Sequence, residues 1–172
     1  IKRKAMTELK DLKDLLIHEV QVLYNTEKYQ LLALPRMLKN ATNDELKGAL
    51  QQHLDETKIH KERLEKVGQL LNIDPDDEGS PSIKGLVFEG EKVLHKDAKP
   101  EVRDAAILAG VQKVEHYEIS GYGTAAYLSE MLGLHEINEL LGETLDEEKA
   151  TDEKLNGIAK NTVNQIAAQV KR

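Results

Sequence analysis

Carboxylate side chains interrupt an apolar stripe in the segment between residues 108 and 132. Leu108, Val111 and Leu132 belong to a series of residues that recur at steps of three and four, and Glu115 and Glu118 fall in the same series. Such steps mark one face of an α-helix, and the apolar members indicate that this face points into a core. The fold must therefore accommodate two carboxylates, one helical turn apart, in an apolar interior.

The composition favours an all-α protein. The 172 residues are rich in Leu, Lys, Glu and Ala, include 11 glycines and 4 prolines, and are 40% hydrophobic. Helix-forming residues in a chain of ordinary domain length predict one helical domain over residues 1–172.

Charge and residue usage exclude several classes of protein. A formal net charge of −7 argues against non-specific binding of nucleic acid, which relies on clustered Lys and Arg. No apolar run approaches the roughly 20 residues that span a bilayer, and no signal-peptide pattern is present, so we expect a cytoplasmic protein without a membrane partner. The absence of cysteine excludes disulfides, thiolate zinc sites, iron–sulfur clusters and a cysteine nucleophile.

Helical periodicity predicts four long helices and a short one. The first runs over about residues 7–40, from Thr7, and Pro35 should kink it or break it near its end. The second starts at a capping box in which Thr42 is the N-cap and Glu45 is the third helical residue, and it ends near residue 71. Ser80 then caps a short helix that ends near residue 95. The last two helices run over about residues 100–133 and from about residue 135 to the C-terminus.

The two halves of the chain resemble each other. Short links predict two antiparallel hairpins, residues 7–72 and 100–172, joined by a crossover of residues 73–99. A shift of 91 positions lays residues 46–64 on residues 137–155, with identical partners at several positions. Our interpretation is a duplicated helical hairpin. The predicted fold is a ferritin-like four-helix bundle with one long connection, which carries the short helix.

Each of the other long helices repeats the anomaly of the segment 108–132. Glu27 interrupts the apolar stripe of the first helix, and His53 and His60 lie in the stripe of the second, with Glu56 beside it. In the fourth helix Glu148 lies in the stripe. Every long helix therefore places a carboxylate or an imidazole near the middle of its buried face.

Two choices remain open at this stage. The apolar stripe favours Glu148 as an inner residue, whereas the internal repeat pairs Glu56 with Glu147. His53 and His60 are equal candidates, because a buried histidine often only completes a hydrogen-bond network.

Buried carboxylates need a counter-charge. An unpaired one costs several kcal/mol, and the central stripes contain neither Arg nor Lys. Two divalent cations would offset about four negative charges, and oxygen and imidazole ligands suit iron, our first choice, or manganese. Four-helix bundles hold carboxylate-bridged metal pairs with this set of residues. The candidate ligands are Glu27, His53, Glu56, His60, Glu115, Glu118, Glu147 and Glu148.

Five runs carry a family resemblance: LLIHEVQVLYNTEKYQLLALPRM, HLDETKIHKERLE, IKGLVFEGEKVL, RDAAILAGVQKVEHYEISGYG and LLGETLDEEKATDEKL. The chain resembles the YciF-like family of bacterial stress-response proteins, a ferritin-like group, and is more distantly similar to rubrerythrin and manganese catalase. The resemblance implies a helical bundle, often a homodimer, with a dinuclear metal site and no firmly assigned reaction. The sequence departs from the usual ferritin-like pattern because Ile59, not a histidine, follows Glu56 by three positions, so that His60 or His53 would have to serve.

Two functional hypotheses follow. The first is a stress-response oxidoreductase of the peroxidase, catalase or ferroxidase type, which handles peroxide, oxygen or ferrous iron at the metal pair. Rubrerythrin's electron relay uses a cysteine-ligated iron domain, so this chain would need an external reductant or a dismutation. The alternative is a non-catalytic structural or interaction bundle with a structural or vestigial metal site.

Overall fold

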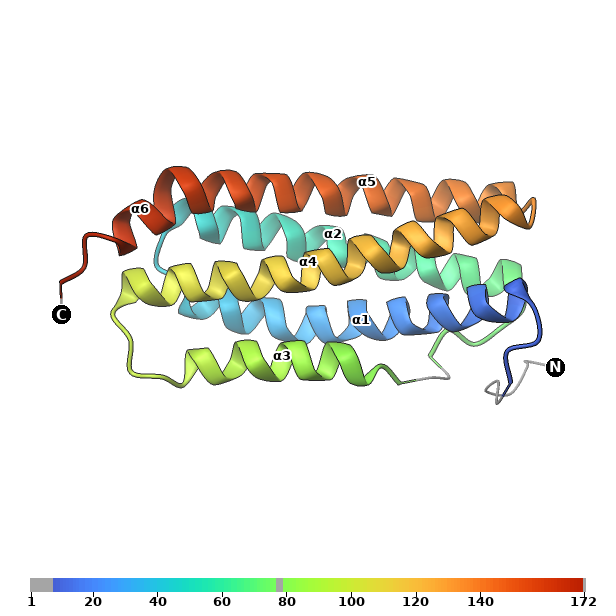
Figure 1. The fold of residues 1–172 in the computed structure, drawn as a ribbon, viewed down its shortest axis with the longest axis horizontal. Helices are drawn as coiled ribbons and strands as arrows, with labels where there is room; N and C mark the ends of the chain where they lie inside the picture. The colour runs from blue at the N-terminus through green and yellow to red at the C-terminus, as the bar shows by residue number, and fades with distance from the viewer. Residues whose placement is uncertain (1–7, 77–78, 172) are drawn as a thin grey trace.

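The computed structural model describes residues 8–76 and 79–171, and the regular structure in those residues is helical throughout. Four long helices run side by side along the length of the molecule (Figure 1). They are α1 (Leu12–Asn40), α2 (Asp44–Leu71), α4 (Pro100–Met131) and α5 (His135–Ile158). The prediction of an all-α bundle is confirmed.

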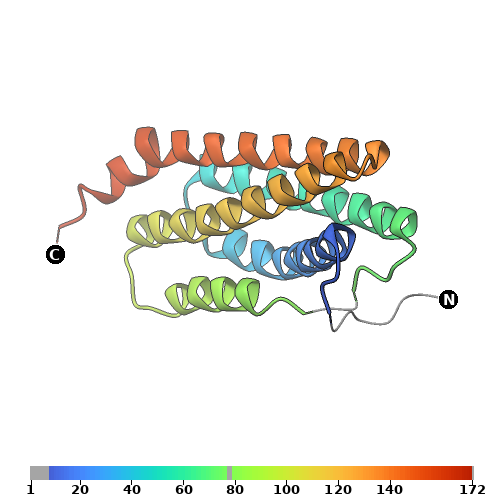
Figure 2. The same ribbon diagram turned by 45° about the vertical axis from the view of Figure 1, so that its right-hand side comes forward.

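The helices pair as the sequence predicts. Helix α1 packs against α2 and α4 against α5, and contacts of α1 with α4 and of α2 with α5 close the bundle. The long connection between α2 and α4 carries α3 (Pro81–Leu94), which contacts α1 and α4 along one side of the bundle (Figure 2). Ser80 is the N-cap of α3, as predicted.

The first helix begins later than predicted. Its predicted start at Thr7 lies outside the described residues, but residues 8–11 are not helical, and Asp11 is the N-cap. The Asp11 carboxylate accepts a hydrogen bond from the backbone N–H of Asp14 at 2.8 Å. The helix then continues through Pro35 to Asn40 instead of breaking at the proline.

The predicted capping box at Thr42 is wrong. Asn43 caps α2, and its side chain accepts from the N–H of Leu46 at 3.0 Å. The Thr42 hydroxyl instead donates to the buried carboxylate of Asp104 on α4 at 2.6 Å, and the N–H groups of Thr42 and Asn43 donate to the same carboxylate at 2.7 and 2.9 Å. A long-range carboxylate therefore outcompetes the local capping pattern.

The last two helices also end differently from the prediction. Helix α4 ends at Met131, and Gly133 adopts a left-handed conformation, with φ of 68°, in the turn that leads to α5. After α5 the chain forms a π-helical segment, η1 (Ala159–Val163), and a short helix, α6 (Asn164–Ala167). Within the described residues, no helix combines the length and the apolar character that crossing a membrane requires.

The apolar core consists of two clusters, one toward each end of the bundle. The first cluster includes Leu34, Leu50 and Leu108, and the second includes Leu16, Leu64 and Leu141. In each long helix the residues of one cluster precede those of the other along the chain, with buried polar residues between them. The four helices thus present a polar layer across the middle of an otherwise apolar interior.

Candidate metal centre

Six ionisable side chains of this polar layer are almost fully buried. Each of the four long helices contributes at least one of them, because each apolar stripe is interrupted at about the same level of the bundle. Each has an exposed fraction of 0 or 1%. The six residues are Glu27, His53, His60, Glu115, Glu118 and Glu148.

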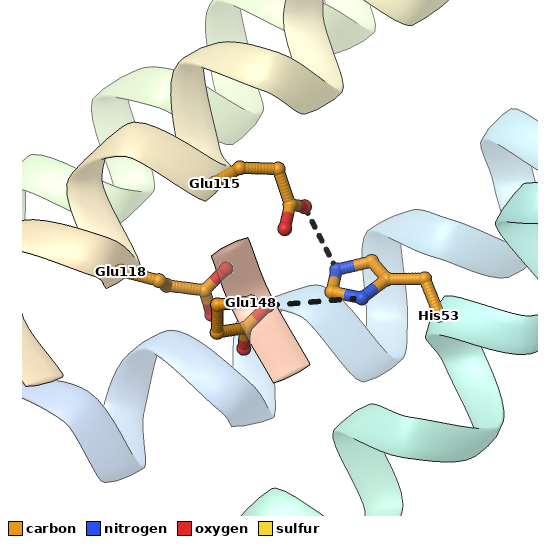
Figure 3. A group of neighbouring side chains, drawn as sticks. All are labelled: His53, Glu115, Glu118 and Glu148. Carbon is orange, nitrogen blue, oxygen red and sulfur yellow. Dashed lines mark ion pairs between the residues drawn. The ribbon is translucent and has the colours of Figure 1, made fainter. Parts of the chain in front are cut away.

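Four of them form one group of donor atoms. His53, Glu115, Glu118 and Glu148 each offer one nitrogen or oxygen atom, and these atoms lie within 4.8 Å of one another (Figure 3). His53 Nε2 is 2.9 Å from Glu115 Oε1, and His53 Nδ1 is 3.9 Å from Glu148 Oε2. The group joins α2, α4 and α5 at one point.

A second group shares one residue with the first. Glu27, His60 and Glu148 also bring one donor atom each within 4.8 Å of one another. His60 Nδ1 lies 2.9 Å from Glu148 Oε1 and 3.6 Å from Glu27 Oε1. Because one Glu148 oxygen faces His53 and the other faces His60, this carboxylate lies between the two groups, where a bridging ligand would lie.

Many of these donor atoms have no hydrogen-bond partner among the described residues, which is unusual because buried polar atoms are nearly always satisfied. Several lie close together without the alignment that a hydrogen bond needs. Two ligands at about 2.1 Å from one ion, at right angles, lie about 3 Å apart. The closest histidine–carboxylate pair in each group, His53 Nε2 with Glu115 Oε1 and His60 Nδ1 with Glu148 Oε1, is 2.9 Å apart. The unpartnered atoms are Glu27 Oε2, His53 Nδ1, His60 Nδ1, Glu118 Oε1 and both carboxylate oxygens of Glu115 and Glu148.

Burial sets the protonation of the group. Burial, followed by the negative charge of Glu148, raises the pKa of Glu27 to about 8. Burial likewise raises the pKa of Glu115 to about 8, and it raises the pKa values of Glu118 and Glu148. Without a cation the carboxylates are therefore driven toward their neutral forms.

The two histidines shift in opposite directions. Burial lowers the pKa of His53. Burial also acts to lower the pKa of His60, but the nearby carboxylates of Glu148 and Glu27 outweigh it and raise the pKa to about 9. The metal-free centre thus uses His60 as its main internal cation.

Residues 11–168 match the model of a protein family described as a domain of unknown function, DUF892. The chain belongs to the DUF892 family. It is 41% identical over 160 residues to protein YciF of Escherichia coli strain K12. The matched region covers 92% of this chain and 96% of that protein. The resemblance to the YciF-like family is therefore confirmed.

Solved structures show the same fold. The crystal structure of the E. coli stress protein YciF matches with a TM-score of 0.86, over 91% of this chain and 99% of that chain, at 41% identity. YcfI from Rhodopseudomonas palustris matches with a TM-score of 0.84, over 88% and 97% of the two chains, at 39% identity. A protein from Xanthomonas campestris, 18% identical, matches over 92% and 98% with a TM-score of 0.72 and shows the fold alone.

In this DUF892 chain, Glu56 lies outside both groups of donor atoms. Its half-buried side chain accepts from Gln52 Nε2 at 2.8 Å and from the Thr151 hydroxyl at 3.3 Å. The residue next to it, Thr57, holds the buried position, and the shift of 91 that pairs Glu56 with Glu147 also pairs Thr57 with Glu148. The repeat therefore aligns buried positions, but the side chain at the aligned position is a threonine in one half and a glutamate in the other.

Glu147 also lies outside both groups. Its side chain is 35% exposed and forms an ion pair with Arg63 of α2. This ion pair lowers the pKa of Glu147. Of the two neighbouring candidates, the structure places Glu148 in the polar layer and Glu147 at its edge, beside His60.

Two residues around the site contact members of the two groups without belonging to either. The Tyr122 hydroxyl, fully buried, donates to Glu27 Oε1. Gln30 Nε2 donates to Glu118 Oε2 at 3.2 Å and lies 3.2 Å from His53 Nε2. The sequence analysis missed Gln30 and Arg63. Gln30 could have been found as a polar residue one turn after Glu27, whereas nothing local marks the contact of Arg63 with α5.

Proposed function

We propose that this chain binds two divalent metal ions, iron in the first place and manganese as the alternative, in the polar layer of the bundle. The observation that carries the proposal is the set of buried donor atoms that have no hydrogen-bond partner in residues 8–76 and 79–171. Four carboxylates enter the two groups, so two divalent ions would balance their charge. Imidazole and carboxylate ligands suit iron and manganese.

The two groups divide the ligands between the ions. His53, Glu115 and Glu118 would hold one ion, and Glu27 and His60 the other. Glu148, with one oxygen toward each group, would bridge them. Fewer side chains of the described residues would hold the second ion, so a small molecule would more readily bind there.

The activity that we propose is reaction with a small oxidant, peroxide or oxygen, or oxidation of ferrous iron. Bound iron or manganese would supply the change of oxidation state that such a reaction needs. E. coli YciF is described as a stress protein, which is in keeping with a defence against oxidants. The chain contains no cysteine, so reducing electrons would come from another molecule or from the substrate itself.

The protein's own groups have distinct roles in this proposal. The apolar clusters on both sides of the polar layer keep bulk water away from the ions. The Tyr122 hydroxyl donates a hydrogen bond to Glu27 Oε1 and so orients that carboxylate. The Gln30 amide does the same for Glu118.

Metal stoichiometry tests the binding. The protein is purified without chelators, loaded anaerobically with Fe(II) or Mn(II), and its metal content is measured by mass spectrometry. We expect two ions per chain, a loss of both in Glu148→Gln, and a loss of one in Glu118→Gln or Glu27→Gln. Glu56→Gln is the matched control, since this carboxylate lies outside both groups, and it should keep both ions. Absence of metal from the loaded wild-type protein would overturn the proposal.

A second measurement separates catalysis from a structural role. The loaded protein is mixed with hydrogen peroxide, and separately with oxygen and excess Fe(II), and consumption is followed. Turnover that disappears in Glu148→Gln supports the oxidoreductase. Two tightly bound ions without turnover would instead identify a structural metal pair, the alternative that the sequence also allowed.

A further inference from the structure

The two ring nitrogens of His60 have different surroundings. Nδ1 faces inward, 2.9 Å from Glu148 Oε1 and 3.6 Å from Glu27 Oε1, and makes no hydrogen bond to the described residues. Nε2 faces outward and lies 2.9 Å from Glu147 Oε2, with which it is hydrogen-bonded. His60 therefore connects the inner donor atoms with a carboxylate at the edge of the polar layer.

Glu147 is held in place from its other side. Arg63 NH1 donates to Glu147 Oε2, and Arg63 NH2 donates to Glu147 Oε1 at 3.1 Å, so that the pair is bidentate. Arg63 is itself anchored on α5, where NH1 donates to the Thr144 hydroxyl at 3.2 Å and NH2 contacts Glu143 at 2.9 Å. A carboxylate with both oxygens engaged in this way is turned toward Arg63 and His60 and away from the inner donors.

This geometry determines which nitrogen keeps its proton when the His60 ring becomes neutral, as it must be to bind a metal ion. An ionised carboxylate accepts hydrogen bonds but cannot donate one, so Nε2 must be the protonated nitrogen in the neutral imidazole. Nδ1 then presents its lone pair to the inner group. Histidines that bind metals are commonly oriented by such a carboxylate on the opposite nitrogen.

We propose that Glu147, fixed by Arg63, is a positioning residue that holds His60 as the Nε2–H tautomer and thereby directs Nδ1 to the second metal ion. The inference rests on the proposed metal pair and adds to it. Glu147 does not itself bind a metal ion. Its loss should lower the affinity for the ion held by Glu27 and His60 and leave the binding of the ion in the His53 group unchanged.

Zinc serves as a diamagnetic probe of the site. Apo protein is titrated with Zn(II), and ring-nitrogen NMR spectra follow His53 and His60 separately. In the wild-type protein we expect His60 Nδ1 to shift on binding while Nε2 keeps its proton. In Glu147→Gln and Glu147→Leu we expect about 10–100-fold weaker binding of the second ion only, with loss of the Nε2–H signal pattern of His60.

Glu143→Gln is the matched control. Glu143 lies one turn before Glu147 on α5, carries the same charge and contacts the same arginine. The hydrogen bond and ion pairs of His60 to the described carboxylates are with Glu147, Glu148 and Glu27 instead. This variant should bind both ions like the wild-type protein. Circular dichroism confirms that each variant is folded, and the Leu variant replaces the Gln variant if the latter is not.

Two outcomes would overturn the inference, and they are distinguishable. If both Glu147 variants bind the second ion as Glu143→Gln does, or if His60 binds zinc through Nε2, the positioning role is wrong while the metal pair stands. If the wild-type protein binds no Zn(II), Fe(II) or Mn(II), the metal pair and the positioning role fall together.

Discussion

At the scale of single residues, the buried carboxyl groups of the polar layer avoid an uncompensated negative charge by holding protons. Bound metal ions would compensate the same charge. In the metal-free protein the pKa values of Glu27 and Glu115 rise to about 8 from 4.5, because burial disfavours the carboxylate form. In the proposed metal pair, a cation would take the place of these protons. Metal binding would therefore release protons from these carboxyl groups, and the metal affinity would depend on pH.

The stability of the apo protein should fall as pH rises from about 5 to 8. Over that range the folded state holds protons on Glu27 and Glu115 that the unfolded state has lost, so that raising the pH favours unfolding. His60, with its pKa raised to about 9 from 6.5, acts in the same direction above pH 6.5. Denaturant unfolding of chelator-treated protein at pH 5, 6, 7 and 8 measures the trend. A free energy of unfolding that rises with pH would contradict it.

The hydroxyl of Tyr122 offers a separate test. Tyr122→Phe keeps the ring but removes the donor to Glu27 Oε1, and the apo protein should lose about 1 kcal/mol of stability. We expect weaker binding of the ion held by Glu27 and His60, measured by titration with Fe(II) under anaerobic conditions. Tyr127→Phe, on the exposed face of the same helix, should change neither quantity.

At this scale the sequence identified most of the side chains that the structure brings together in the two donor groups. Glu27, Glu115, Glu118 and Glu148 could be found because a carboxylate inside an apolar stripe is visible in the helical period. From the sequence alone, Glu147 could not be distinguished from a candidate ligand, because its contacts depend on a side chain from another helix. Arg63 reaches it across the α2–α5 interface, and no local pattern records that contact.

At the scale of helices, α1 and α4 approach closely where Gly121 faces Leu23. A Cβ atom at position 121 would lie 2.8 Å from Leu23 Cδ2, so the buried Leu23 side chain would have to shift within the core. Gly121→Ala should therefore destabilise the protein by about 1–3 kcal/mol through overpacking. Gly123→Ala, two residues later, meets nothing within 4 Å and should stabilise the helix by up to about 1 kcal/mol. Chemical denaturation of the two variants decides between these signs.

The helices themselves were largely predictable, and their ends less so. Amphipathic periodicity located α1, α2, α4 and α5, but the capping signal at Thr42 misled because Asp104 from a distant helix takes its hydrogen bonds. The π-helical segment Ala159–Val163 was also missed. Its hydrogen bonds join residues five apart in the sequence instead of four. Over only five residues this difference hardly changes the apolar periodicity.

At the scale of the whole molecule, metal binding should stabilise the folded bundle. The candidate ligands come from α1, α2, α4 and α5, so each proposed ion would join helices that are distant in the sequence. At a free metal concentration about 1,000 times Kd, one site adds about 4 kcal/mol. For a chain of this length that raises Tm by on the order of 10 °C. Calorimetry with and without chelator measures the shift, which should be absent in Glu148→Gln.

The division of the apolar core into two clusters has a consequence for cooperativity. With the polar layer empty and partly protonated, little apolar contact links one end of the bundle to the other. We expect the apo protein to open in two steps, one end before the other, as separate folding units. Metal would merge these units into one. Amide hydrogen exchange would then show two classes of protection in the apo protein, residues near Leu16 in one and residues near Leu50 in the other, and a single class in the metal-bound form.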